Sequence, residues 1–245
     1  MEPSLTPSGP SPEIPRPPRR SPLNGRLASS RGVAREEDGW LVYDAFGETE
    51  AEAARAREGV VVADESSNGR IELLGPGAGR ALAGVCACGA LDIGEGGVRE
   101  GVRAYRVAEE RYLVGTLRGG EEAVLAGLAG AAGCRVRDLT DAWAEIRLVG
   151  PASRALLASV CPLDLSPAAL PDRGASRGRV LHWEQTVIRR DLGPWPGFSL
   201  WGPRAAGIGL WDGLLQAGRT WGAAPIGLAA LKELKIVSQI YRELG

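Results

Sequence analysis

The chain has 245 residues, of which 44% are hydrophobic and 24% are charged, and its formal net charge is -1. This balance is ordinary for a globular protein, and the length suits one large domain or two small ones. Neutrality argues against nucleic acid or an anionic membrane as a partner. No apolar run approaches the roughly 20 residues that cross a bilayer, and no secretory signal opens the chain. We therefore expect a cytoplasmic protein.

Residues 1–20 are rich in Pro, Ser and Arg, which predicts a disordered tail, with a polyproline ligand as the alternative. Order is expected from residue 21 to residue 245. The Ala-, Glu- and Arg-rich segment 48–58 predicts a helix. Gly59 ends it, and residues 60–63 then predict a buried strand.

An internal repeat is the most informative feature of the chain. Residues 71–86 read IELLGPGAGRALAGVC, and residues 146–161 read IRLVGPASRALLASVC. With the two Gly-Pro pairs aligned, Ile, Leu, Val and Cys positions match at one constant offset. Each copy predicts a short strand, a turn and an apolar helix.

The same order of elements follows each copy of the repeat. Two alternating segments predict a β-hairpin, and a helix comes next. These segments are 104–107, 112–115 and 121–128 in the first half, and 186–189, 198–202 and 205–217 in the second. The sequence thus predicts an α+β fold of two strand–helix–strand–strand–helix units, about 60–130 and 135–218, related by a pseudo-twofold axis. We expect helices to cover one face of each antiparallel sheet.

The four cysteines, at positions 86, 88, 134 and 161, are expected to be reduced and buried, because a chain of this size needs no disulfides. Cys86 and Cys88 could bind a soft metal, but the remaining cysteines lack CxxC spacing. His182 is the only histidine. We therefore predict no metal site and no histidine-based catalytic pair.

Several segments resemble the glycine-cleavage aminomethyltransferase (T-protein) family: residues 51–64, Ser66, Gly69, the Gly75-Pro76 pair, and segments 210–218 and 227–230. Residues 138–165 resemble the gamma subunit of heterotetrameric sarcosine oxidase, a relative in the same superfamily. The resemblance covers roughly residues 21–240. It implies an aminomethyltransferase-like folate-binding domain over 21–245, tetrahydrofolate as the cofactor, and a link to one-carbon, glycine or sarcosine metabolism.

The chain departs from the family pattern at the positions that handle folate. An Asp-Asp pair of the family appears here as Glu100-Gly101, and the family's pterin-binding Glu appears as Ser199. The Arg and Asp of the family's last helix appear as Leu231 and Lys232. We expect no counterpart of the family's C-terminal barrel. We therefore expect tetrahydrofolate binding to be weakened or lost.

Five residues are candidates for the site. Glu100 is the candidate general base toward an amine, which requires a raised pKa; as a loop carboxylate flanked by Arg99 and Arg103 it would instead stay ionised. The candidate cofactor-binding residues are Trp195, Ser199, Trp201 and Asp64. Packing is the alternative role for the tryptophans, and capping of the local backbone is the alternative for Asp64.

Two functions stay open. One is a tetrahydrofolate-dependent aminomethyl or methyl transferase, and the other is a non-catalytic subunit or scaffold in a hetero-oligomer. We favour a folate-binding family protein with a degenerate active site. The gamma-subunit resemblance implies a larger flavin-containing or other oxidoreductase subunit as partner. The apolar side of segment 228–236 would then mark an interface, unless that helix folds back onto its own sheet.

Overall fold

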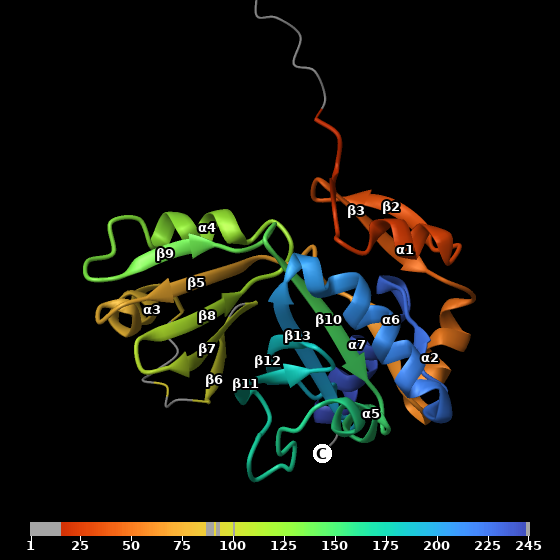
Figure 1. The fold of residues 1–245 in the computed structure, drawn as a ribbon. Helices are drawn as coiled ribbons and strands as arrows, with labels where there is room; N and C mark the ends of the chain where they lie inside the picture. The colour runs from red at the N-terminus through yellow and green to blue at the C-terminus, as the bar shows by residue number, and fades with distance from the viewer. Residues whose placement is uncertain (1–15, 87–90, 92–93, 100, 244–245) are drawn as a thin grey trace, which may run out of the picture.

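The computed structural model describes residues 16–86, 91, 94–99 and 101–243, and for residues 98, 99 and 237–243 it describes the backbone alone (Figure 1). In chain order the elements are β1 (Arg19–Arg20), α1 (Asn24–Ser29), β2 (Val33–Glu37), β3 (Trp40–Ala45), α2 (Thr49–Glu58), β4 (Val61–Asp64), β5 (Arg70–Leu74), α3 (Ala78–Cys86), β6 (Gly96–Arg99), β7 (Val102–Ala108), β8 (Arg111–Gly115), α4 (Glu121–Gly127), β9 (Arg135–Asp138), β10 (Trp143–Val149), α5 (Ser153–Val160), β11 (Ala175–Val180), β12 (Trp183–Arg189), β13 (Gly197–Pro203), α6 (Gly207–Ala217), β14 (Ala224–Pro225) and α7 (Leu228–Glu243). These strands form three sheets, ordered β1-β3-β2, β11-β12-β13-β10-β4-β14 and β6-β7-β8-β5-β9.

The small N-terminal sheet includes residues that the sequence places in the tail. β1 pairs in parallel with β3, and the Arg19 guanidinium lies 4.2 Å from the centre of the Trp40 ring. The same guanidinium forms ion pairs with Glu121 and Asp141. Order therefore begins before residue 21. Composition did not reveal this, because the stabilising partners lie far along the chain.

Each half of the repeat contains one more strand than predicted. The first half runs β5, α3, β6, β7, β8, α4, and the second runs β10, α5, β11, β12, β13, α6. The additional strands are β6 and β11, which extend each hairpin into a three-stranded meander at the sheet edge. Their sequences, GGVR and ASRGRV, lack the apolar alternation by which a strand is recognised.

The two halves exchange strands across the molecule. β4, at the start of the first unit, pairs with β10 of the second, and β9, at the start of the second unit, pairs with β5 of the first. The registers correspond, because Asp64 lies opposite Ile146 and Asp138 lies opposite Ile71. Each large sheet is therefore built from both halves of the chain.

The Gly-Pro turns of the repeat are places of close backbone approach. Gly75 and Gly150 have φ angles of 127° and 129°, a region that favours glycine. A Cβ at Gly150 would lie 2.4 Å from the Gly59 carbonyl oxygen, and a Cβ at Gly75 would lie 2.7 Å from that of Gly133. Each turn thus requires glycine for both its conformation and its packing.

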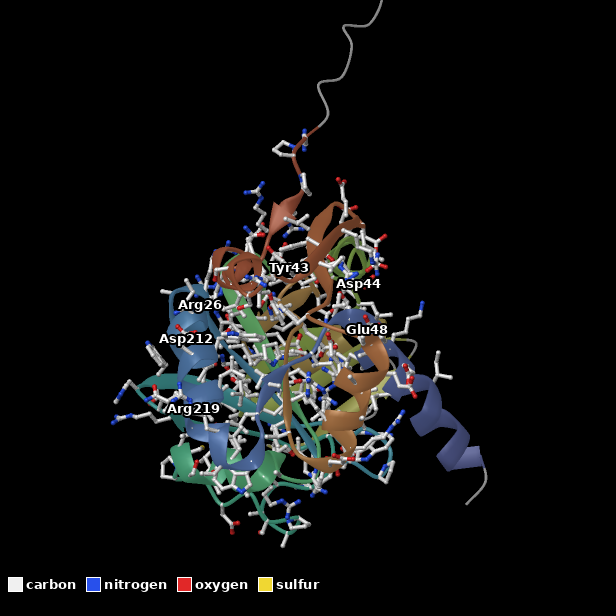
Figure 2. All side chains as sticks on the ribbon, turned by 90° about the vertical axis from the view of Figure 1, so that its right-hand side faces the viewer. Arg26, Tyr43, Asp44, Glu48, Asp212 and Arg219 are labelled. Carbon is white, nitrogen blue, oxygen red and sulfur yellow. The ribbon has the colours of Figure 1, made fainter. Side chains whose placement is uncertain are left out.

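Helices cover one face of each large sheet, and the other faces meet. α1, α5 and α6 bury one face of the six-stranded sheet, and an ion pair between Arg26 on α1 and Asp212 on α6 joins the two helices at the surface (Figure 2). α3 and α4 cover the five-stranded sheet. On the remaining faces Tyr105 packs edge-on against Trp201, with ring centres 5.5 Å apart. The second face of the six-stranded sheet is thus shared between the five-stranded sheet and the helix pair α2 and α7.

The apolar side of α7 is covered by its own chain. Leu231 and Leu234 are buried in a cluster with Ala53 and Ala56 of α2. Ile236 is 52% exposed. Among residues whose side chains are described, the helix therefore folds back onto the chain, and these leucines do not form the exposed patch that a subunit interface would need.

The cysteines are only partly as expected. Cys134 and Cys161 are free thiols, but Cys134 is half-buried, and Cys86 is disulfide-bonded, so the expectation of four reduced thiols is wrong. That expectation rested on the size of the core, which removes the need for a disulfide without preventing one. Cys88 lies outside the described residues. None of the described helices is long and apolar enough to cross a membrane.

Candidate functional site

A cleft of about 410 Å³ lies where the five-stranded sheet and α7 meet over the six-stranded sheet. β7 contributes Arg103 and Tyr105, β10 contributes Arg147, and α7 contributes Lys235. The remaining lining residues are Gly101, Leu117, Asp172, Arg173, Arg190, Asp191 and Leu192. A second cavity of about 410 Å³ shares Leu117 and Lys235 with the first and extends past Glu65 and Lys232.

Strand alternation explains why charged side chains point into this region. In β10, Ile146 and Leu148 face the helix-covered core, so Glu145 and Arg147 face the opposite side. Their partners in β13 are Trp201 and Ser199. The alternation of side chains along β10 therefore places its apolar residues in the core and its charged residues toward the cleft.

A buried network of ion pairs forms the floor of the cleft. Glu145, which is fully buried, lies 3.0 Å from Arg190, 3.5 Å from Arg70 and 3.7 Å from Arg103. Glu65 lies 3.0 Å from Arg190 and, on its other oxygen, 3.2 Å from Lys235. With Arg147, five cationic groups surround two carboxylates, so positive charge is in excess.

The pKa values of the two central arginines, Arg147 and Arg190, are shifted in opposite directions. Burial and, next to it, the adjacent Arg190 charge lower the pKa of Arg147 to about 9. Burial acts in the same direction on Arg190, but Glu65 and Glu145 outweigh it and raise the pKa of Arg190 above its usual value. Burial opposes ionisation of Glu65, yet Arg190 and Lys235 hold its pKa well below the usual range. The two carboxylates thus stabilise the charged form of Arg190 more than that of Arg147.

Four buried polar atoms on β7, β10 and β13 beside the cleft have no hydrogen-bond partner among the described residues. They are Arg103 Nη1, Tyr105 Oη, Arg147 Nε and Trp201 Nε1. Buried polar groups are normally paired, and each unpaired one costs roughly 1–3 kcal/mol. Three of the four belong to residues that line the cleft, so the cleft offers hydrogen-bond donors to a ligand.

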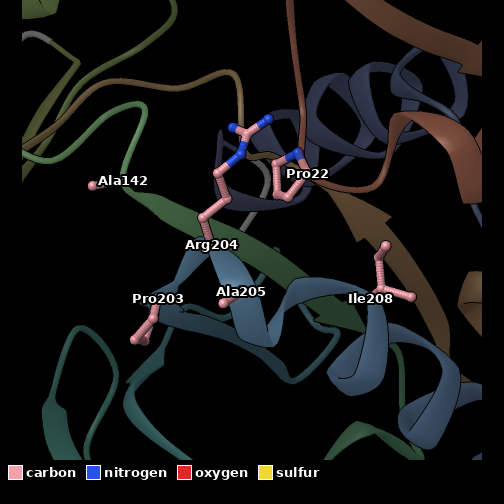
Figure 3. Close-up of a pocket in the computed structure, with 6 residues that line it drawn as sticks. All are labelled: Pro22, Ala142, Pro203, Arg204, Ala205 and Ile208. Carbon is pink, nitrogen blue, oxygen red and sulfur yellow. The ribbon is translucent and has the colours of Figure 1, made fainter.

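A further hollow of about 600 Å³ on the surface differs in chemistry. It is lined by Pro22, Ala142, Pro203, Arg204, Ala205 and Ile208 (Figure 3). Arg204 is the one charged side chain there, and it donates to the Arg20 carbonyl oxygen at 3.0 Å. Nothing in this hollow gathers groups that could perform chemistry, so the cationic cleft is the candidate site.

Residues 23–242 match the sequence model of the GCVT N-terminal domain family. The chain belongs to the GCVT N-terminal domain family. Similar proteins include the aminomethyltransferases of Streptomyces avermitilis (28% identity, 89% of this chain and 62% of the relative) and Frankia alni (31%, 89% and 63%). Sarcosine oxidase subunit alpha of Rhizobium meliloti is 27% identical over 90% of this chain and 25% of its own. The chain thus spans under two thirds of these aminomethyltransferases.

Two solved structures share the fold of this family member. Aminomethyltransferase T of the glycine cleavage system from Bartonella henselae superposes with a TM-score of 0.74 at 21% identity, covering 89% of this chain and 62% of that one. A chain of heterotetrameric sarcosine oxidase from Corynebacterium sp. U-96 superposes with a TM-score of 0.64 at 20% identity, covering 85% and 99%. The mixed α+β architecture expected from the sequence is therefore that of the family.

Ser199 and Trp201 of this GCVT-family chain lie beneath the cleft. Ser199 is fully buried, and its hydroxyl accepts hydrogen bonds from Arg190 Nη1 at 3.1 Å and Arg147 Nη1 at 3.4 Å. Trp201 is also buried, with the Arg103 guanidinium 5.8 Å from its ring. A hydroxyl between two guanidiniums thus occupies the position where the resemblance places a pterin-binding carboxylate.

The other predicted site residues lie elsewhere. Trp195 packs against the cluster of α2 and α7 and lines neither cavity. Asp64 accepts a hydrogen bond from the Ser66 amide at 2.9 Å and interacts with Ser21, on the face toward α1; burial raises its pKa. Glu100 lies outside the described residues, and its catalytic role stays a prediction. Neighbouring Gly101 lines the cleft.

The central charged residues were missed from the sequence. Glu145 and Arg147 lie inside β10, whose other residues are apolar, and Arg70 begins β5; a buried charge in a strand is unusual unless it is paired. That alternation of apolar and charged residues was the available signal. We expected helices to cover one face of each sheet and assigned nothing to the other face, which the structure shows is covered by another sheet.

Proposed function

We propose that this chain is a ligand-binding member of its family, that its cleft binds a tetrahydrofolate-type molecule, and that aminomethyl transfer is weak or absent. The position of Ser199 between Arg147 and Arg190 is the observation that carries the proposal. The resemblance implies a tetrahydrofolate site, and the two adjoining cavities offer room for a long, two-part ligand. Ser199 replaces the Glu that, by the resemblance, would hold the pterin ring.

The loss of transfer chemistry follows from the state of the acids beside the cleft. A general base works best with a pKa near the operating pH, which for a carboxylate requires a raised value. Glu65 has the opposite environment, since Arg190 and Lys235 hold its pKa well below the usual range. Glu145 is enclosed by three guanidiniums. Glu65 is therefore not poised to accept a proton from an amine at neutral pH, and the oxygens of Glu145 are already occupied by ion pairs.

Tetrahydrofolate titration followed by tryptophan fluorescence tests the binding proposal. Trp201 lies beneath the cleft lining, so a bound ligand should change its emission with saturation. Arg103→Gln should weaken binding about tenfold, because it removes a charged donor. Arg179→Gln is the matched control, since this exposed β11 residue makes only a 3.9 Å ion pair with Glu184. Absence of both a fluorescence change and a calorimetric heat would contradict folate binding.

Turnover tests the second half of the proposal. Loss of a positioned base costs about 10²–10⁴-fold in rate. Aminomethyl transfer by this chain should therefore fall at least about 100-fold below that of a related aminomethyltransferase assayed in parallel. Comparable turnover would show that a carboxylate such as Glu100 performs the chemistry.

A second candidate function is that of a non-catalytic subunit in a hetero-oligomer with a larger oxidoreductase chain. It is supported by similarity to a complete chain of the heterotetrameric sarcosine oxidase and to its alpha subunit in another organism. The covered apolar side of α7 removes one surface on which we expected such a partner. Light scattering with a co-expressed oxidoreductase chain of the sarcosine oxidase type would show a joint species if this function holds, and separate species otherwise.

A further inference from the structure

We infer that the floor of the cleft is an oxyanion site in which Arg103, Tyr105 and Arg147 receive a carboxylate of the ligand, rather than the donor edge of a pterin ring. The inference deepens the proposed function and rests on it for placing the ligand in this cleft. These three residues would bind the acidic part of a ligand whose remaining part is apolar or aromatic.

The available hydrogen-bonding groups argue for an acceptor in the ligand. Arg103 Nη1 and Arg147 Nε are donors, and Tyr105 Oη is a hydroxyl that can donate; none has a hydrogen-bond partner among the described residues, although Arg103 Nη1 lies 3.7 Å from Glu145 in an ion pair. The described acids at the cleft are already engaged. Each oxygen of Glu65, Glu145 and Asp191 contacts a cationic group, and Asp172 accepts a hydrogen bond from the Asp191 amide and lies 3.9 Å from Arg173. A pterin edge carries N–H donors that need acceptors, which this floor does not offer, whereas a carboxylate accepts from every group named.

Charge supports the same assignment. Arg147 is buried, and no carboxylate of the described residues lies within 4 Å of its guanidinium; its partners are the Ser199 hydroxyl and the Arg190 carbonyl oxygen. A buried cation without a counter-charge is unfavourable, and a neutral ligand would leave it so. A carboxylate would provide the counter-charge and a charge-assisted hydrogen bond at once. The lowered pKa of Arg147 is consistent with this imbalance.

The mouth of the cleft suggests what carries the carboxylate. Leu117 lines both cavities and is 63% exposed, and a Cβ on Gly101 would lie 3.6 Å from it. An exposed leucine above a cationic floor offers apolar contact to the ligand body while the floor pairs with its acid. The ligand class is therefore an aromatic or aliphatic carboxylate, of which the benzoyl-glutamate portion of a folate is one example.

Separated fragments of folate test the inference by calorimetry. p-Aminobenzoyl-glutamate carries carboxylates without a pterin, and 6-hydroxymethylpterin carries the ring without a carboxylate. We expect the first to bind and the second not to bind. Binding of the pterin without binding of p-aminobenzoyl-glutamate overturns the inference. Binding of inorganic phosphate alone overturns it too, because the floor would then be a phosphate site.

Tyr105→Phe is the decisive variant. Its hydroxyl has no partner within the described chain, so its removal should leave the melting temperature unchanged or higher. Affinity for p-aminobenzoyl-glutamate should nevertheless fall several-fold, up to about tenfold. The matched control is Tyr112→Phe on β8, whose ring faces the helix-covered side of the same sheet. Unchanged affinity in Tyr105→Phe overturns the assignment of this hydroxyl.

Arg147→Gln separates the inference from the proposed function. It should lower the affinity for p-aminobenzoyl-glutamate at least about tenfold, since a charge-assisted hydrogen bond is lost. If p-aminobenzoyl-glutamate binds and responds to this change but tetrahydrofolate does not bind, the proposed function fails and the oxyanion site stands. If tetrahydrofolate binds with an affinity that Arg147→Gln does not alter, the oxyanion site fails and folate binding stands.

Discussion

Glu65 shows how one buried residue stabilises the folded chain through its charge. It is 4% exposed and pairs with Arg190 and Lys235 through different oxygens. Burial alone would favour the neutral acid, but the two cations reverse this and hold its pKa well below the ordinary value of 4.5. The folded state therefore binds fewer protons than the unfolded chain in acid.

The pH dependence of stability follows from that sign. Stability contributed by Glu65 is fully present above its unfolded pKa, near 4.5, and is lost as pH falls toward the folded value. Glu65→Gln should cost about 3–5 kcal/mol at pH 7, because Arg190 keeps a buried charge with one partner fewer. The difference between variant and wild type should shrink in acid. Denaturant unfolding at pH 7 and pH 4 measures both, and a constant difference would contradict the linkage.

The Gly-Pro turns are the elements that join the halves. Their positive φ angles and the carbonyl oxygens packed against them place Gly75 beside Gly133 and Gly150 beside Gly59. Each turn connects a central strand to its helix at the point where the chain from the other half passes. The Gly-Pro pair is thus repeated in the sequence because both turns require the same backbone geometry.

Gly150→Ala should be severely destabilising, by more than about 2 kcal/mol, because the new Cβ meets backbone at 2.4 Å in a conformation that alanine rarely adopts. Gly75→Ala should behave similarly, with its 2.7 Å contact. Gly84→Ala is the control, since this α3 position has nothing within 4 Å and alanine there should stabilise by up to about 1 kcal/mol. Equal melting temperatures for the Gly150 and Gly84 variants would refute this account.

At the scale of the whole molecule, strand exchange makes the two large sheets interdependent. β4 completes the second half's sheet and β9 completes the first half's sheet. Arg70 and Glu145, equivalent positions of the repeat, form an ion pair across the junction between the halves. Neither half retains its full sheet if the other unfolds.

Unfolding should therefore be a single cooperative transition. Tryptophan fluorescence reports mostly on the second half, since no tryptophan lies in residues 60–130, whereas far-ultraviolet circular dichroism reports on both halves. We expect the two probes to give the same denaturant midpoint. A fluorescence transition displaced from the dichroism transition would show that the halves unfold separately.

The sequence by itself determined the family and, apart from the edge strands, the order of strands and helices within the repeat. Local signals were sufficient for this: alternating strands, glycine turns and apolar helices depend on neighbouring residues, and the repeat doubled each signal. Ser199 was also selected from its sequence position. The edge strands β6 and β11 were missed, because Gly- and Arg-rich strands carry no local pattern.

Only the tertiary structure decided which side chains share the cleft. Glu65, Arg103, Glu145, Arg190 and Lys235 come from separate strands, loops and α7, and their contacts join residues up to 170 positions apart. The same alternation that identifies a strand does not say whether its polar face meets water or another sheet. Here a second sheet covers that face, so charges that would have been solvated became a buried, positively charged site.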